Sequence, residues 1–230
     1  MREQLPTSTT RPPFSHLILY GLIAGLIIGI SALAVFLLID RFSSRGKSEN
    51  AQIQDITADF DGTIAIDPPI AVPDIKLANS DNELAGLSDW RGQFVLLTFG
   101  FTHCPDVCPL TLSEFQRIQS QLGRLADEVQ FVFVSVDGAR DSPAVLREYF
   151  SFRGYDEIIA LTGSEEVIRA LGAPLGLAFE VGEELTRGGY LVNHTAGSFL
   201  LDRNGSWITR YQFGVPPATI VADLRRLLQA

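Results

Sequence analysis

The sequence predicts an α/β domain, in which helices flank a central mixed β-sheet, behind one N-terminal transmembrane helix. Three observations predict this organisation. Continuous apolar runs typical of buried strands alternate with segments of helical periodicity from about residue 93. A strand–turn–strand pattern and an amphipathic helix then close the chain. Far upstream, residues 17–39 carry no charged side chain over 23 positions.

The apolar segment 17–39 has the length that a helix needs to cross about 30 Å of hydrocarbon. A cleaved signal peptide has a shorter apolar region, about 7–15 residues, and a small-residue cleavage site, whereas this run ends in IDRF. We therefore predict an uncleaved membrane anchor. It separates an N-terminal tail, 1–16, from a hydrophilic linker, 40–61, and a folded domain, 62–230.

The charge balance excludes one class of partner. The chain has 18 basic and 27 acidic residues, and residues 1–47 hold five of the bases and two of the acids, which leaves a net charge of −12 for the rest. Binding to nucleic acid needs a basic face, so nucleic acid is not an expected partner. Charge does not orient the predicted anchor, because basic residues lie on both sides of it: Arg2, Arg11, Arg41, Arg45 and Lys47.

The elements of the domain follow from periodicity and turn signals. Buried strands are expected in the apolar runs QFVLLTFGF and VQFVFVSVD, and Ser164 is placed to cap a helix. The segment up to about Ala71 shows little periodicity and is expected as an extended lead-in. The predicted order is strand 93–101, helix 109–125, strand 129–137, helix 142–152, strand 157–163, helix 164–172, strand 197–202, strand 206–212 and helix 216–230. A β-α-β crossover, a hairpin and a terminal helix in this order are typical of a thioredoxin-like fold.

The stretch FGFTHCPDVCPLTLSEF holds the protein's two cysteines, Cys104 and Cys108, where the first strand ends and the first helix begins. A helix N-terminus favours the thiolate, which is the form that attacks disulfides and binds soft metals. A purely structural disulfide would stabilise little, because it would close a very short loop. The cysteine pair alone leaves thiol redox chemistry and metal binding open.

His194 favours metal binding. In a thioredoxin-like layout, the segment before strand 197–202 faces the cysteine turn, and redox members usually have a cis-proline there, whereas this chain has no proline between Pro174 and Pro216. Two thiolates and one imidazole suit copper and are adequate for zinc. The other histidines are weaker candidates: His103 adjoins Cys104 at the end of its strand, and His16 borders the apolar segment.

Three linked motifs resemble the Sco/SenC family of membrane-anchored copper proteins: FGFTHCPDVCP, SVDGARDSP and YLVNHTAGSFLLDRNG. The likeness covers about residues 62–228 in the family's order. It implies a metallochaperone that binds one copper ion, as Cu(I), Cu(II) or both, through Cys104, Cys108 and His194. It also implies acidic residues at Asp106 and Asp137 that orient the site or dock a partner.

As implied partners, the resemblance gives the copper-accepting subunit of a respiratory oxidase, typically subunit II of cytochrome c oxidase, and other copper chaperones. We expect the domain to face the periplasmic side of a bacterial cell membrane. Two positions depart from the family pattern, because Asn193 stands where Asp is common and Gly138 where Pro is common. Because asparagine lacks the charge of aspartate, any role of an anion at position 193 in orienting His194 or docking a partner is in doubt, whereas the three ligands are intact.

The alternative is an enzyme, a thiol–disulfide oxidoreductase in which Cys104 and Cys108 reduce the cysteines of an acceptor such as oxidase subunit II. The extra residue relative to a C-x-x-C pair and the histidine in place of a proline-containing segment favour the copper chaperone. A peroxidase is a weaker reading still, since only Arg140 could supply the arginine that such a site needs.

Overall fold

The computed structural model describes residues 62–184 and 189–229, together with Leu33. The predicted tail 1–16 and linker 40–61 lie outside the described residues, and so does the predicted anchor 17–39 apart from Leu33. Among the described residues, no helix combines the length and the apolar character needed to cross a membrane. The prediction of an anchor is therefore untested by the structure.

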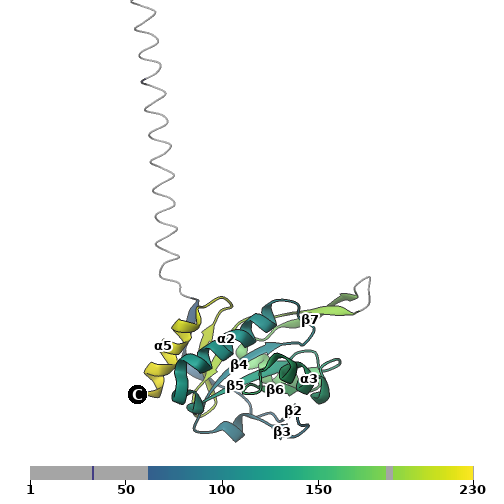
Figure 1. The fold of residues 1–230 in the computed structure, drawn as a ribbon, viewed down its shortest axis with the longest axis horizontal. Helices are drawn as coiled ribbons and strands as arrows, with labels where there is room; N and C mark the ends of the chain where they lie inside the picture. Colours follow the sequence, from purple (N-terminus) through teal and green to yellow (C-terminus); the bar gives the residue numbers. More distant parts are fainter. Residues whose placement is uncertain (1–32, 34–61, 185–188, 230) are drawn as a thin grey trace, which may run out of the picture. The chain divides into compact units, whose positions relative to one another are not determined.

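Eight strands form one mixed sheet in the order β1-β10-β9-β4-β5-β6-β2-β3 (Figure 1). Strands β4, β5 and β6 pair in parallel, and the remaining pairs in the sheet are antiparallel. The strands are β1 Thr63–Ala71, β2 Leu77–Asn79, β3 Leu84–Ala85, β4 Phe94–Gly100, β5 Val129–Ser135, β6 Ile159–Thr162, β9 Ser198–Leu201 and β10 Ser206–Tyr211. The predicted central mixed sheet is confirmed.

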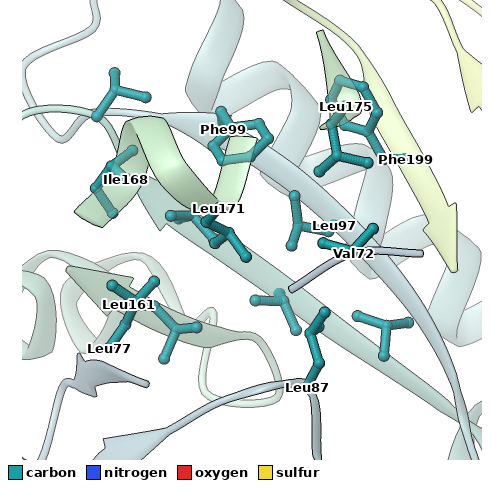
Figure 2. Close-up of a cluster of buried hydrophobic side chains, with 14 of the residues drawn as sticks. Val72, Leu77, Leu87, Leu97, Phe99, Leu161, Ile168, Leu171, Leu175 and Phe199 are labelled. Atoms are coloured by element: carbon teal, nitrogen blue, oxygen red, sulfur yellow. The ribbon is translucent and has the colours of Figure 1, made fainter. Parts of the chain in front are cut away.

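Helices cover both faces of this sheet. The helices of the described residues are α2 Val107–Leu122, η1 Leu87–Trp90, η2 Gly123–Glu128, α3 Pro143–Arg153, α4 Glu165–Gly172, η3 Ala173–Leu175 and α5 Pro217–Leu228. One buried cluster joins α2, α3 and α5 to the sheet, and a second joins α4, η1 and η3 to its other face. Figure 2 shows part of the second cluster, with Leu97, Ile168 and Leu171 among its members.

Strand β4 shows why its sequence is apolar throughout. Successive side chains of a strand point to opposite faces, and here both faces are covered. Leu96 therefore packs in the cluster with α2, and Leu97 in the cluster with α4. Every residue of β4 is buried, so the cysteine turn begins at the end of a firmly packed strand.

The segment before Ala71 is a correction to the sequence interpretation. It is not a lead-in but strand β1, which pairs antiparallel with β10 at the edge of the sheet. The register shifts between Ala65 and Ile70, the stretch that contains Pro68 and Pro69. Proline has no N–H to donate to a ladder, which hid the strand signal and confines such a strand to an edge.

A second sheet was not predicted. It is the hairpin of β7 Phe179–Glu184 and β8 Tyr190–His194, which forms its own two-stranded sheet. Figure 1 shows β7 extending away from the helices that cover the main sheet. This hairpin matters for function because His194 is its last residue.

The packing of the core predicts that two phenylalanine-to-alanine substitutions lower the free energy of unfolding by different amounts. Phe115→Ala should lower the free energy of unfolding by about 3–5 kcal/mol, because Phe115 on α2 is 1% exposed and leaves a cavity. Phe152→Ala is the matched control, since Phe152 on α3 is 87% exposed, and it should change stability by less than about 0.5 kcal/mol. Urea denaturation measures both, and equal costs would contradict the described packing.

Candidate metal centre

The cysteines lie on the turn from β4 into α2. The Cys104 amide donates to the Phe101 carbonyl at 3.2 Å, and the Cys108 amide donates to Cys104 Sγ at 3.4 Å. Both thiols are free; Cys104 is half-buried, and Cys108, in the first turn of α2, is buried. The turn therefore presents one accessible and one covered sulfur.

A buried carboxylate that the sequence interpretation missed fixes this turn. Asp141 has no exposed surface, and it accepts hydrogen bonds from the Thr102 amide (2.9 Å), from Thr102 Oγ1 (2.5 Å) and from Ser135 Oγ (2.6 Å). Thr102 follows β4 and Ser135 ends β5, two neighbouring parallel strands. Thr102 and Ser135, two hydroxyl residues near the ends of adjacent parallel strands, were the sequence signal that could have indicated a shared polar partner.

His194 reaches the cysteine turn from a segment 86 residues further along the chain. Its Nε2 lies 3.6 Å from Cys108 Sγ. The antiparallel pairing of β4 with β9, in which Thr98 faces Ser198, brings the end of β4 beside the start of β9, just after His194. The Phe101 ring meets the imidazole edge to face at 6.0 Å between centroids. The predicted approach of this segment to the cysteines is thus seen for Cys108.

Burial determines the protonation of His194. Loss of hydration lowers the pKa of the imidazole, and its hydrogen bond to a backbone carbonyl opposes this more weakly. Nδ1 lies 3.0 Å from the Thr195 carbonyl oxygen, which can only accept, so Nδ1 carries the proton. The neutral ring then has its lone pair on Nε2, facing the Cys108 sulfur. This is the tautomer that a metal ligand needs.

Burial also raises the pKa of the Cys108 thiol, and the hydrogen bond with Cys104 acts in the same direction. For Cys108, desolvation therefore acts against the thiolate form that the helix N-terminus is expected to favour. Cys108 is held as a thiol, and a metal ion that binds it must displace the proton.

The donor separations fit a soft ion only in part. A sulfur and a nitrogen bound to one tetrahedral ion at about 2.3 and 2.0 Å lie about 3.5 Å apart, close to the 3.6 Å between Cys108 Sγ and His194 Nε2. In residues 62–184 and 189–229, however, no group of three or more His, Cys, Asp or Glu side chains is close enough to hold a metal ion. Cys104 Sγ accepts a hydrogen bond from the Cys108 amide, and its side chain also interacts with the Cys108 thiol.

The other predicted residues do not converge on the sulfurs. Asp106 is exposed and does not cap α2 with its side chain. Asp137 is buried and binds Arg140 Nε at 2.5 Å and the Tyr190 hydroxyl at 2.7 Å. The Arg140 guanidinium is therefore paired with the Asp137 carboxylate, which the peroxidase hypothesis did not take into account.

Three remaining positions of the motifs have structural explanations or contacts of their own. Exposed Asn193 lies opposite Glu180 in the hairpin register. His103 is hydrogen-bonded to Thr102 Oγ1 at 3.0 Å and is also exposed. At Gly138 an added Cβ would overlap the carbonyl oxygen of Gly163, so a close approach of two backbones requires glycine in this chain.

Asp141→Asn should destabilise the protein by about 2–3 kcal/mol, because the amide nitrogen cannot accept and the remaining hydrogen bonds lose their charged acceptor. The same change at exposed Asp106 is the control and should have little effect. Chemical denaturation measures both, together with the rate at which an alkylating reagent modifies Cys104. Equal effects of the two substitutions would contradict the structural role of Asp141.

His194 also predicts a pH dependence of stability. Because folding lowers its pKa below 6.5, the unfolded chain binds the proton more readily, and stability should fall as the pH drops below about 6.5. Above that pH the ring is neutral in both states and the contribution is complete. His194→Gln should remove this component of the slope between pH 7.5 and 5. Parallel stability curves for the two proteins would contradict it.

Comparison with known proteins places the chain in a family. Residues 66–229 match the SCO1/SenC family model. A Stutzerimonas stutzeri protein described as copper-binding is 37% identical over 139 residues, which are 59% of this chain and 66% of that protein.

Solved structures have the same fold. ScoI of Bradyrhizobium japonicum, solved with copper bound, is 29% identical over 68% of this chain and 98% of its own, with a TM-score of 0.62. The apo Sco1 of Thermus thermophilus is 34% identical over 73% of this chain and 96% of its own, with a TM-score of 0.64. The chain belongs to the SCO1/SenC family and has its thioredoxin-like fold.

Proposed function

We propose that the protein is a copper metallochaperone that binds one copper ion through Cys104, Cys108 and His194. The observation that carries the proposal is the 3.6 Å separation of Cys108 Sγ and His194 Nε2, with the second thiol on the same turn. Thiolates hold Cu(I), and the addition of an imidazole also permits Cu(II). The copper-bound ScoI of Bradyrhizobium japonicum and the copper-bound Sco1 of yeast support the choice of metal.

The transferred ion is the cargo of this reaction. Half-buried Cys104 is the sulfur that an acceptor reaches first, because Cys108 is buried. Transfer would proceed by ligand exchange, in which a donor of the acceptor replaces one donor of the chaperone before the others leave. The exposed carboxylate of Asp106, beside the site, is placed to meet a basic group on that acceptor.

The acceptor in this proposal is the copper-bearing subunit of a respiratory cytochrome c oxidase, and other copper chaperones supply the ion. Family membership supports this, because BsSco, a solved structure of the same fold, is described as a member of the Sco family of cytochrome c oxidase assembly proteins. We further propose that residues 17–39 anchor the chain in the cell membrane, with residues 40–61 as the linker and the domain on the extracytoplasmic side.

A second function, thiol–disulfide exchange, is favoured by the unequal burial of the two sulfurs. The Cys104 thiolate would attack a disulfide of the acceptor, releasing one acceptor thiolate and forming a mixed disulfide. Cys108, after losing its proton, would then attack Cys104, releasing the second acceptor thiol. The protein ends with a Cys104–Cys108 disulfide, and its two thiols have supplied the two electrons. Such a reduction could prepare the acceptor's cysteines for copper.

Copper titration of the reduced full-length protein under nitrogen tests the first function. The wild type should bind one Cu(I), and Cys104→Ser and Cys108→Ser should each lose tight binding. His194→Ala should weaken Cu(II) binding more than Cu(I) binding, because the thiolates carry most of the Cu(I) affinity. His103→Ala, which changes an exposed histidine near the same turn, is the matched control and should bind as the wild type does.

A competition assay with a Cu(I) chelator measures these affinities. Unchanged Cu(I) affinity in both cysteine variants would overturn the metallochaperone. Rapid multiple-turnover reduction of a disulfide substrate by a protein without tight copper binding would favour the second function in its place.

A further inference from the structure

The hairpin β7–β8 carries His194 but does not belong to the main sheet. An isolated two-stranded hairpin is only marginally stable, so contacts with the rest of the domain must orient it. Phe179, the direct cross-strand partner of His194, and Val192 are buried in the core and hold the base of the hairpin. Apolar contacts have little directionality, so they hold the base of the hairpin in the core without fixing its angle to the domain. The orientation of the imidazole therefore depends on directional contacts.

Arg140 makes such a contact with β8. Its Nη1 donates to the Tyr190 carbonyl at 2.8 Å, and its guanidinium carbon lies 3.6 Å from the centroid of the Tyr190 ring. Asp137 completes the arrangement, because it accepts from Arg140 Nε and from the Tyr190 hydroxyl. The guanidinium also lies 5.9 Å from the Phe101 ring, which meets the imidazole of His194.

Arg169 on α4 repeats the same pattern on β7. Its Nη2 donates to the Phe179 carbonyl at 3.0 Å, and its guanidinium carbon lies 4.0 Å from the centroid of the Phe179 ring. Glu165 holds this arginine with a hydrogen bond of 2.8 Å to Nε. Each strand of the hairpin is therefore held by an arginine that stacks on one aromatic ring and binds the backbone carbonyl of the same residue.

We propose that Arg140 and Arg169 form a clasp that sets His194 against Cys108, and that both are positioning residues of the site. The proposal rests on the proposed function in taking His194 as a metal ligand. A planar guanidinium can stack and donate in a fixed direction at the same time, which an ammonium cannot. Arg140, on the loop after β5, holds strand β8, and Arg169, on helix α4, holds strand β7. The two contacts together give the imidazole one orientation before the metal ion binds.

The clasp predicts a larger effect on Cu(II) than on Cu(I). Loss of one arginine leaves both thiols in place on their own turn and loosens only the imidazole. Changes in residues that orient a metal ligand typically cost about 10–100-fold in affinity. Arg140→Lys and Arg169→Lys should each weaken Cu(II) binding by about this factor and alter the hyperfine splitting in the Cu(II) electron paramagnetic resonance spectrum.

Arg147→Lys is the matched control. Arg147 on α3 donates to the Ser80 carbonyl and pairs with Asp81, which are exposed contacts that involve no hairpin residue. Full-length wild type and all three lysine variants would be compared in the copper-free state by hydrogen exchange of the amides of 179–184 and 190–194, and then with Cu(II). Faster exchange confined to the hairpin, with a changed Cu(II) spectrum, in the Arg140 and Arg169 variants alone is the expected result.

Exchange rates and spectra equal to those of Arg147→Lys would overturn the clasp. If a lysine variant fails to fold, Tyr190→Leu removes the stacked ring and keeps the Arg140–Asp137 pair, and it should give the same hairpin exchange and Cu(II) changes. A wild type that binds no copper would instead overturn the proposed function. The hydrogen-exchange comparison would then decide the clasp on its own.

Discussion

The antiparallel pairing of β4 with β9 is the constraint on which the candidate centre depends. Each strand is buried and cannot slip by one residue without turning its apolar side chains to the wrong face. The end of β4 leads into the cysteine turn, and the start of β9 follows His194. The sheet register therefore brings together groups that lie 86 residues apart, and the loops only adjust their final positions.

Burial at this place has two opposite consequences for the donors. It keeps His194 neutral with its lone pair available, and it keeps Cys108 protonated. Both effects arise because a low-dielectric environment disfavours charge. A metal ion reverses the second effect by replacing the thiol proton. In the proposed function, the site holds a cation that arrives with its own charge, and half-buried Cys104 is the donor that exchanges.

The sequence predicted the parts of the fold that have strong local signals. Strands β4 and β5 and helices α2 to α5 follow from apolar runs, helical periodicity and serine caps. Strand β1 was missed because two prolines interrupt its ladder. The hairpin was also not predicted, although Phe179 and Val192 pack in the core. The convergence of His194 on Cys108 was predicted from the order of elements. The only sequence signal for Asp141 was the pair of hydroxyl residues near the ends of β4 and β5, and the arginine contacts depend on side-chain directions that no sequence pattern contains.

Copper K-edge X-ray absorption of the full-length protein loaded with one Cu(I) tests the central claim most directly, because it counts the sulfur and nitrogen donors around the ion. The account predicts two sulfur donors and one nitrogen donor, with the nitrogen lost in His194→Ala. A first shell of two sulfurs that is the same in the wild type and in His194→Ala would contradict it, because the meeting of the imidazole with the cysteine turn would then have no part in holding copper.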